Sequence, residues 1–310
     1  MVDDMDDALI ASWSRSKRAE GRSEATIEAY ENDTRRLAEH LGTRGLGLST
    51  AKRGDLEACL ADGREAGLAP ATLARRFRSW QQFYRWAEEE EEVDANPMAK
   101  MKPPRVVAPP VPVITAETLT KLLAECNRPR KRIGRPAPAN PERATFENKR
   151  DAALVMMLST TGVRAGEIMG LSVADVDLNA ATFTVMGKGG RARVVALMPK
   201  PAEALDRYMR VRRKHAAATL PALWLGERGQ LTGSGLRQLL DRRCDDAGIE
   251  HINPHRFRHT FAHEAKSRGM SDGDLMVIAG WQSPQMLHRY GASAAADRAR
   301  DSHRRLFGKD

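Results

Sequence analysis

Aromatic residues and cysteines are both scarce in this chain of 310 residues, which contains 5% Phe, Trp and Tyr and only four tyrosines. The three cysteines, Cys59, Cys126 and Cys244, lie far apart in the sequence. They therefore form neither a disulfide framework nor the CxxC spacing of a zinc site. We expect free thiols in a reducing cytoplasm, and neither a metal ion nor another cofactor.

Long hydrophobic runs are also lacking. No stretch approaches the roughly 18 apolar residues of a membrane-spanning helix. The first residues, MVDDMDDALI, are acidic, whereas a secretory signal peptide begins with basic residues. The sequence therefore predicts neither a membrane span nor a signal peptide.

Charge is plentiful by contrast. Hydrophobic residues make up 41% of the chain and charged residues 29%, which is typical of a globular protein. The formal net charge is +9 and the pI is about 9.7. This excess favours a polyanionic partner, with nucleic acid first and an anionic membrane surface second.

Proline marks a boundary between two blocks. The early part of the chain has apolar residues at helical spacing, whereas NPMAKMKPPRVVAPPVPVI (96–114) contains six prolines and favours an extended connection. We predict a helical domain at 1–98, a linker at 99–114 and a second domain at 115–310. In the second domain, ADVDL, TFTVM and ARVVALM read as strands between helices. The predicted fold class is therefore mainly α with a small antiparallel β-sheet (α+β).

A basic stripe lies on the helix predicted to begin near Pro70. Its apolar positions include Phe77 and Trp80, and arginines stand between them. These arginines are Arg75, Arg76 and Arg78. Exposed arginines are commonly just solvated, but the acidic run AEEEEEVD is segregated to the far end of the same segment. We interpret the stripe as a surface that meets anions.

Four residues of the second block have the chemistry needed to handle a phosphodiester. Arg164 follows a Thr-Gly turn, and Arg258 lies three residues after His255 on one helical face. Two guanidinium groups could bind the non-bridging oxygens of a phosphate and neutralise a pentacoordinate transition state. Lys188, in the glycine-flanked turn GKGGR, could protonate a leaving oxygen, and His255 could transfer protons. Taken alone, Arg164 and Lys188 are more simply explained as ordinary surface residues, and His255 could be a local hydrogen-bonding residue.

The order and spacing of these motifs resemble the tyrosine recombinase (phage integrase) family. The Thr-Gly-apolar-Arg box reads TGVRAGEIMGL, the hairpin lysine stands in VMGKGGRARVV, and the His-x-x-Arg box reads PHRFRHTFAHE. The last box is AGW, with Tyr290 nine positions after Trp281. The pattern extends over residues 148–306, and the N-terminal block is similar to the helical core-binding domain of this family.

The resemblance implies a C-shaped clamp on DNA, with a core-binding domain at 1–98 and a catalytic domain with a tail helix at 115–310. It implies that Tyr290 attacks the scissile phosphate and forms a 3′-phosphotyrosyl link without ATP or metal. The catalytic residues it implies are Arg164, Lys188, His255, Arg258, Trp281 and Tyr290, supported by Glu167 and His259. The residues assigned to DNA binding are Arg75, Arg76, Arg78, Arg191 and Arg193.

The resemblance also implies partners. The first is double-stranded DNA with short inverted core half-sites. The second is further copies of the chain, which form a homotetramer on two duplexes. The C-terminal tail docks on a neighbouring protomer or, alternatively, on its own domain. Because the core-binding helices begin almost at Met1, we expect the simple form without an arm-binding domain, acting in the cytoplasm or nucleoid of a bacterial host.

Several roles remain open within and beside this family. Trp281, where many members have histidine, and the basic stretch 128–143 favour a phage or mobile-element integrase. The nearest alternative is an Xer-type recombinase that resolves chromosome or plasmid dimers. Two further candidates are a type IB topoisomerase and a catalytically inert DNA-binding regulator.

Overall fold

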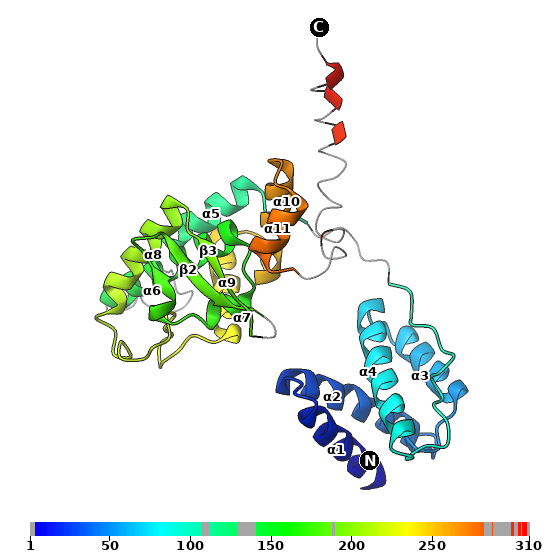
Figure 1. Ribbon diagram of the computed structural model, residues 1–310. Coiled ribbons are helices and arrows are strands. Elements are labelled where there is room, and N and C mark those ends of the chain that lie inside the picture. The colour runs from blue at the N-terminus through cyan, green and yellow to red at the C-terminus, as the bar shows by residue number, and fades with distance from the viewer. Residues whose placement is uncertain are drawn as a thin grey trace. The chain divides into compact units, whose positions relative to one another are not determined.

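The computed structural model describes residues 4–106, 112–128, 141–187 and 190–281, together with 287, 299–300, 303–304 and 306–308. The chain divides into two compact units, Met1–Pro109 and Pro110–Asp310 (Figure 1). This division falls inside the segment predicted as a linker. Each unit has its own hydrophobic core. The predicted domain boundaries and the C-shaped arrangement of the two units stay predictions.

The described part of the first unit is helical throughout its regular elements. These are α1 (Asp4–Ala19), α2 (Glu24–Gly42), α3 (Arg53–Glu65) and α4 (Pro70–Glu89). The side chain of Ser23 accepts a hydrogen bond from the backbone N–H of Thr26 and so caps α2. Pro70 opens α4 at a position whose N–H would have no helical partner.

The core of the first unit is aromatic. Trp13 and Phe83 pack edge to face with ring centroids 5.3 Å apart, and the Tyr84 hydroxyl donates to the carbonyl of Leu48 at 3.0 Å. Met98 and Met101 are buried against this core, so the packing of the first unit continues past α4. The scarce aromatic residues of the chain are thus concentrated where a small helical unit needs large buried side chains.

The second unit combines helices with a small sheet. Its helices are α5 (Ala116–Cys126), α6 (Pro141–Thr161), α7 (Ala165–Met169), η1 (Val173–Asp175), α8 (Pro199–Arg212), α9 (Gly233–Ala247), α10 (Pro254–Ser267) and α11 (Asp272–Ala279). Its strands are β1 (Val176–Asp177), β2 (Thr182–Met186) and β3 (Ala192–Ala196), paired antiparallel in the order β1-β2-β3. The predicted fold class, mainly α with a small antiparallel sheet, is confirmed.

The first predicted strand is much shorter than expected. Only Val176 and Asp177 of ADVDL form a strand. The preceding residues form the single turn η1, because the Asp175 carboxylate accepts hydrogen bonds from the backbone N–H and the hydroxyl of Ser172. The predicted tail helix lies mostly outside the described residues.

Helix α6 is the centre of the second unit, since it packs against α5, α8 and α10. Helix α10 also holds the incoming chain. The backbone N–H of Ile114 donates to the Thr260 hydroxyl at 2.8 Å, and Arg256 donates to the Pro112 carbonyl at 3.0 Å. Within the described residues, no helix is both long enough and apolar enough to cross a membrane.

A buried ionic cluster ties three of these helices together. Arg243 of α9 is 1% exposed and donates to the Asp151 carboxylate of α6, to the side chain of Asn148 and to the carbonyl of Glu125 at the end of α5, each at 2.9 Å. Arg150 donates to the other oxygen of Asp151 at 2.9 Å. Arg243 and Arg150 thus have hydrogen-bond acceptors and a counter-charge in this cluster. A buried charge is tolerated under these conditions.

Removing the carboxylate of this cluster tests its contribution to stability. We expect Asp151→Asn to lower the free energy of unfolding by about 3–5 kcal/mol, because two buried guanidinium groups lose their counter-charge. Urea unfolding of the full chain measures the change. Asp206→Asn is the matched control, since it breaks an exposed pair with Arg210 on α8 and should cost less than about 1 kcal/mol. If both variants lost the same free energy of unfolding, the buried cluster would not contribute more to stability than an exposed ion pair.

Candidate active site

The turn between α6 and α7 sets the position of Arg164. Gly162 adopts the left-handed conformation with φ 63°, and a Cβ there would lie 2.3 Å from Cδ1 of Phe261. Only glycine therefore fits between α6 and α10. The turn makes Arg164 the N-cap residue of α7, so its backbone is fixed at the edge of a helix while its side chain is 38% exposed.

Glu167 lies at the third position of α7 and binds two arginines. Its carboxylate accepts from the backbone N–H of Arg164 at 2.8 Å and from Nη1 of Arg164 at 2.7 Å. Arg193 of β3 donates to both carboxylate oxygens, at 3.0 and 2.7 Å. This geometry matches the expectation that Glu167 supports Arg164, and it adds a second guanidinium.

The ionisation of Glu167 follows from these contacts. Burial by itself raises the pKa of this carboxyl group, but the hydrogen bonds from Arg193 and Arg164 outweigh burial and lower the pKa to about 2. The carboxylate is therefore fully charged at neutral pH and holds both guanidinium groups in place.

Arg258 reaches the same place from α10. It is 1% exposed and donates to the carbonyl of Gly162 at 2.5 Å and to the carbonyl of Ala279 at 2.6 Å. The ring of Trp281 lies beside it, with the guanidinium carbon 5.1 Å from the ring centroid. Helix α10 starts from Asn253, whose side chain caps it by accepting from the backbone N–H of Arg256.

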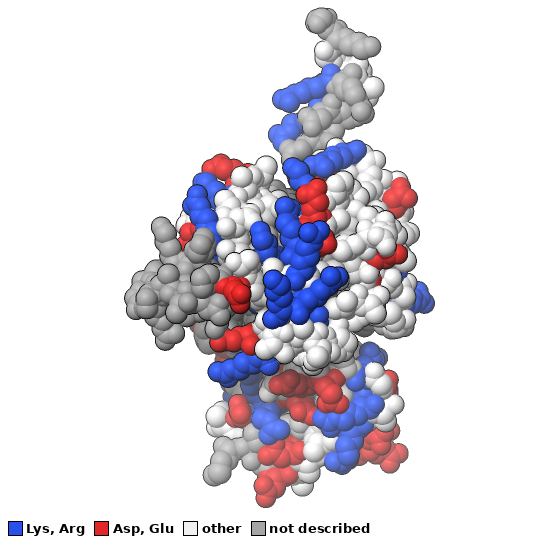
Figure 2. All heavy atoms as spheres, turned by 90° about the vertical axis from the view of Figure 1, so that its left-hand side faces the viewer, with Lys and Arg blue, Asp and Glu red and all other residues white. Residues whose placement is uncertain are grey.

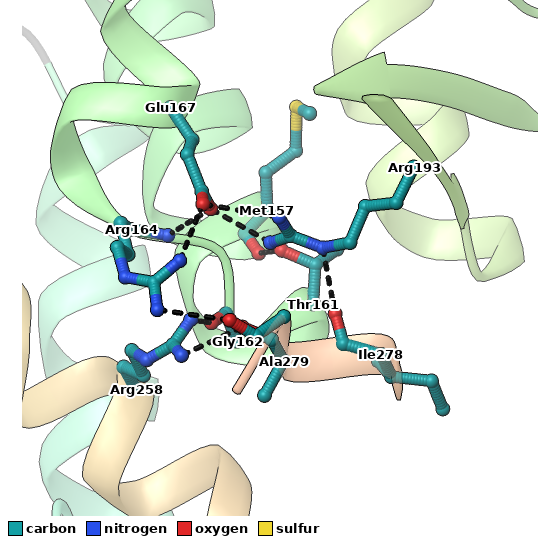
Figure 3. A network of polar contacts seen from close by, with 10 residues as sticks. Met157, Thr161, Gly162, Arg164, Glu167, Arg193, Arg258, Ile278 and Ala279 are labelled. Carbon is teal, nitrogen blue, oxygen red and sulfur yellow. Dashed lines mark hydrogen bonds and ion pairs between the residues drawn. The ribbon is translucent and has the colours of Figure 1, made fainter. Parts of the chain in front are cut away.

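The end of α11 joins all three arginines (Figure 3). The carbonyls of Ile278, Ala279 and Gly280 accept from Arg193 at 3.0 Å, from Arg258 at 2.6 Å and from Arg164 at 3.0 Å, respectively. The last carbonyls of a helix have no partner within it, and cations are favoured at this end. We call this set of contacts the carbonyl cradle. It brings Arg164 and Arg258 together from boxes that are far apart in the sequence.

Two of the three histidines of α10, His255 and His259, lie next to each other. The rings of His255 and His259 are perpendicular, with centroids 4.8 Å apart. His255 is exposed, whereas His259 is buried. An exposed imidazole can exchange protons with a ligand, and the buried one can only support its neighbour. Among the described residues, no group of His, Cys, Asp and Glu is arranged to hold a metal ion.

Arg193 occupies a place that the sequence reading did not foresee. Its side chain is 14% exposed, and its donors point to Glu167 and Ile278 within the protein. A signal was present in the sequence, because residues alternate between the two faces of a strand. Arg193 is therefore on the same face of β3 as the buried Val195, and it pairs in register with the buried Val185.

The arginines predicted to bind DNA in the first unit differ in their surroundings. Arg75 donates to the buried carboxylate of Asp33 while half of its side chain stays exposed. A surface groove of about 540 Å³ between α2 and α4 is lined by Arg36, Arg75 and Arg76 among others. Arg78 instead donates to a main-chain carbonyl of its own helix. Arg75 is thus the arginine of this set that a buried acidic group orients.

Basic residues also gather away from the carbonyl cradle. Figure 2 shows Lys and Arg along one face of the second unit. Helix α8 carries the exposed Arg207 and Arg210, each paired with an acidic residue one turn earlier. Such pairs are typical of a solvated helix face, so the charge of α8 does not by itself indicate a site.

Two predicted residues lie outside the part of the chain that the structure describes. They are the proposed nucleophile Tyr290 and the hairpin residue Lys188. The turn that contains Lys188 is closed by a hydrogen bond from the backbone N–H of Gly187 to the carbonyl of Arg191 at 2.8 Å. Arg191 is exposed at this turn, as a residue that contacts a ligand would be.

Comparison with protein families gives a match in each unit. The model described as the phage integrase family matches residues 113–297, and the phage integrase N-terminal SAM-like domain matches residues 14–91. Tyrosine recombinase XerC of Corynebacterium efficiens is 29% identical over 271 residues, which are 87% of this chain and 81% of that protein. Tyrosine recombinase XerC of Pelotomaculum thermopropionicum is 31% identical over 229 residues, 71% of this chain and 70% of that protein.

Solved structures show the same fold at lower identity. The site-specific recombinase XerH bound to a palindromic difH substrate has a TM-score of 0.71 at 17% identity, over 93% of this chain and 82% of that chain. The Tn1549 transposon integrase in complex with transposon right end DNA has a TM-score of 0.70 at 19% identity, over 96% of this chain and 99% of that chain.

The pH dependence of stability tests the ionic contacts of Glu167. Its pKa in the folded chain, about 2, is below the ordinary value of 4.5, so the ionised carboxylate stabilises the fold above about pH 4.5. This contribution is lost as the pH falls from about 4.5 towards 2. We expect Glu167→Gln to lower the free energy of unfolding by about 3 kcal/mol at pH 7 and to flatten its pH dependence in that window.

Denaturant titrations at a series of pH values measure this effect. Glu203→Gln, which removes an exposed carboxylate on α8, is the matched control and should keep the wild-type curve. A wild-type curve for Glu167→Gln would show that the carboxylate is not held by the two arginines.

Proposed function

The chain belongs to the phage integrase family of tyrosine recombinases, and on this premise we propose that Tyr290 cuts DNA and carries its 3′ end. The enzyme is a tyrosine-type site-specific DNA recombinase. Its proposed reaction begins when the phenolic oxygen of Tyr290 attacks the scissile phosphate. The new bond joins this oxygen to phosphorus, and the bond from phosphorus to the 5′ oxygen breaks.

The observation that carries the proposal is the carbonyl cradle. It holds Arg164 and Arg258 against the end of α11, and Tyr290 follows this helix in the sequence by only eleven residues. Arg164 keeps N–H donors beyond those bound to Glu167 and Gly280, because a guanidinium has five. Two guanidinium groups fixed in advance can neutralise the charge that develops on the phosphate without reorganising during the reaction.

The remaining roles concern protons. A free tyrosine has a pKa of about 10, so its attack at neutral pH depends on an electrophilic, well-positioned phosphate. We assign protonation of the leaving 5′ oxygen to Lys188 and assistance of proton transfer to His255, supported by His259. Trp281 packs against the phosphate pocket or donates its indole N–H. The 5′ hydroxyl of a partner strand then attacks the phosphotyrosyl link, and since the phosphodiester is conserved, ATP and metal are not required.

DNA binding is assigned to arginines on both units. The groove between α2 and α4 presents Arg75 and Arg76 to a phosphate backbone, and Arg191 extends from the turn between β2 and β3. Arg78 belongs to the same proposed surface. Arginine suits this role because its planar fork matches phosphate oxygens. The proposed DNA is a short core site of two inverted half-sites.

The assembly and the biological role are more specific proposals than the enzyme class. We propose a homotetramer on two duplexes, with the C-terminal tail docked on a neighbouring protomer, acting in the bacterial cytoplasm or nucleoid. For the role, the sequence reading favoured a phage or mobile-element integrase. The XerC relatives support the Xer-type alternative instead, and the Tn1549 transposon integrase shows that mobile-element recombinases share the fold. The identity of the target site separates the two roles.

Covalent capture tests the nucleophile. Purified protein is mixed with sheared DNA from its own source, including the flanks of its gene, and the reaction is quenched with detergent. We expect protein-linked fragments from the wild type and a loss of at least about 1,000-fold in Tyr290→Phe, with DNA binding retained, because the nucleophilic oxygen is gone. Sequencing of the fragments then gives the site.

Each outcome of this capture has a distinct meaning. Fragments from the gene flanks favour a mobile element, and one chromosomal repeat favours an Xer-type role. Fragments scattered over all DNA favour a type IB topoisomerase. Adducts that persist in Tyr290→Phe would move the nucleophile elsewhere, and DNA binding without adducts in the wild type favours an inert regulator.

Salt dependence tests the groove of the first unit. Each phosphate contact contributes about −0.9 to the slope of log K against log salt. We expect Arg75→Gln to reduce the magnitude of this slope by about 0.9, measured by fluorescence anisotropy on a duplex recovered from the capture. Arg207→Gln removes the same charge from the solvated face of α8 and should leave the slope unchanged. Equal changes in both variants would indicate a net-charge effect without a contact.

A further inference from the structure

We propose that Arg193 is a positioning residue of the strand-cleavage reaction and that it acts through Glu167 and the end of α11 rather than through contact with DNA. This inference rests on the proposed function, because it concerns how Arg164 is held against the phosphate. It replaces the DNA-binding role that the sequence reading gave to Arg193.

Arg193 directs all three of its side-chain nitrogen atoms to acceptors within the protein. Nη1 and Nη2 bind the two oxygens of Glu167 at 3.0 and 2.7 Å, and Nε binds the Ile278 carbonyl at 3.0 Å. One planar group thus makes a two-pronged contact with a carboxylate on α7 and a third contact with the end of α11 (Figure 3). With 14% of its side chain exposed, Arg193 has little surface to offer a duplex.

The surrounding backbone is shaped to admit this guanidinium. Gly280 adopts φ 63°, and a Cβ there would lie 2.8 Å from Nη1 and 2.9 Å from Cζ of Arg193. Any other residue at position 280 would therefore meet the guanidinium. Arg193 pairs in register with the buried Val185 and lies on the same face of the sheet. The neighbouring Val194 lies on the opposite face and is 68% exposed. Both features direct Arg193 into the protein.

The contacts of Arg193 close a ring with Arg164. The same oxygen of Glu167 accepts from Nη1 of Arg193 at 3.0 Å and from Nη1 of Arg164 at 2.7 Å. Arg164 then donates to the Gly280 carbonyl at 3.0 Å, and two residues of backbone lead from Gly280 to Ile278, which Arg193 binds. Without Arg193, the carboxylate of Glu167 keeps only its two contacts with Arg164 itself, and the link from Arg164 through Glu167 to β3 is lost.

Lysine cannot replace arginine in this ring. An ammonium group is a single point of charge on a flexible stem, so it cannot hold two carboxylate oxygens and a carbonyl in one plane. Both Arg193→Lys and Arg193→Gln should therefore misplace Arg164. A misplacement of about 1 Å at a reacting group costs about 100-fold in rate.

The first measurement is single-turnover adduct formation at saturating duplex, with the DNA recovered by covalent capture. We expect Arg193→Lys and Arg193→Gln to slow adduct formation by about 10- to 100-fold while the DNA affinity and its salt slope stay as in the wild type. Arg207→Gln on α8 is the matched control for loss of one arginine and should react at the wild-type rate. Arg191→Gln provides the contrast, because removing a phosphate-binding side chain from the turn reduces the salt slope by about 0.9.

The second measurement separates positioning from a general loss of structure. A duplex with a methylphosphonate at the scissile position lacks one negatively charged oxygen, so the placement of Arg164 matters less for its cleavage. We expect the rate ratio of wild type to Arg193→Gln to shrink by about 10-fold on this duplex. A smaller fraction of folded enzyme would lower both rates equally and leave the ratio unchanged.

Four outcomes would overturn the inference. If an Arg193 variant had a reduced salt slope and formed adducts at the wild-type rate, Arg193 would be a DNA-binding residue. If the rate ratio of wild type to Arg193→Gln were the same on both duplexes, Arg193 would have only a structural role. Absence of adducts from the wild-type protein would remove the proposed function itself and the inference with it. Wild-type adducts together with unimpaired Arg193 variants would overturn the inference alone.

Discussion

The end of helix α11 is the constraint on which the candidate active site depends. An α-helix leaves its last carbonyls without partners, and here three of them bind arginines from a loop, a strand and another helix. Each arginine would cost free energy if its charge were buried alone, and each carbonyl would cost free energy if it lacked a donor. Their combination satisfies both groups and fixes the relative positions of α7, β3, α10 and α11.

Arginine is used in a second way in the buried cluster around Asp151. In the cluster around Asp151, Arg243 is 1% exposed and its contacts lie between helices, so its role is to stabilise the unit. In the carbonyl cradle, Arg164 keeps part of its side chain exposed. Exposure thus distinguishes Arg164, which can also receive a ligand, from Arg243, whose contacts lie within the protein.

The main features of the fold were predictable because they are local. The glycine-containing turn GKGGR lies between two five-residue strands, and Glu167 at the third position of α7 follows from the spacing of TGVRAGE. The carbonyl cradle was not predictable in the same way, because Arg193 and Ile278 are 85 residues apart and only the folded chain brings them together. The sequence predicted DNA binding for Arg193, although the alternation of strand residues indicated that Arg193 shares a face with the buried Val195. Arg75 shows the same limit, since its buried partner Asp33 lies on a different helix.

The low pKa of Glu167 has a consequence for how the chemistry can be observed. Arginine side chains remain protonated at every pH that proteins tolerate, and Glu167 loses its proton at about pH 2. The frame that holds the phosphate site therefore keeps one charge state across the whole working range of an enzyme. Because these arginines and Glu167 do not titrate in that range, an inflection in a plot of rate against pH reports on other groups, such as an imidazole, an amine or a phenol.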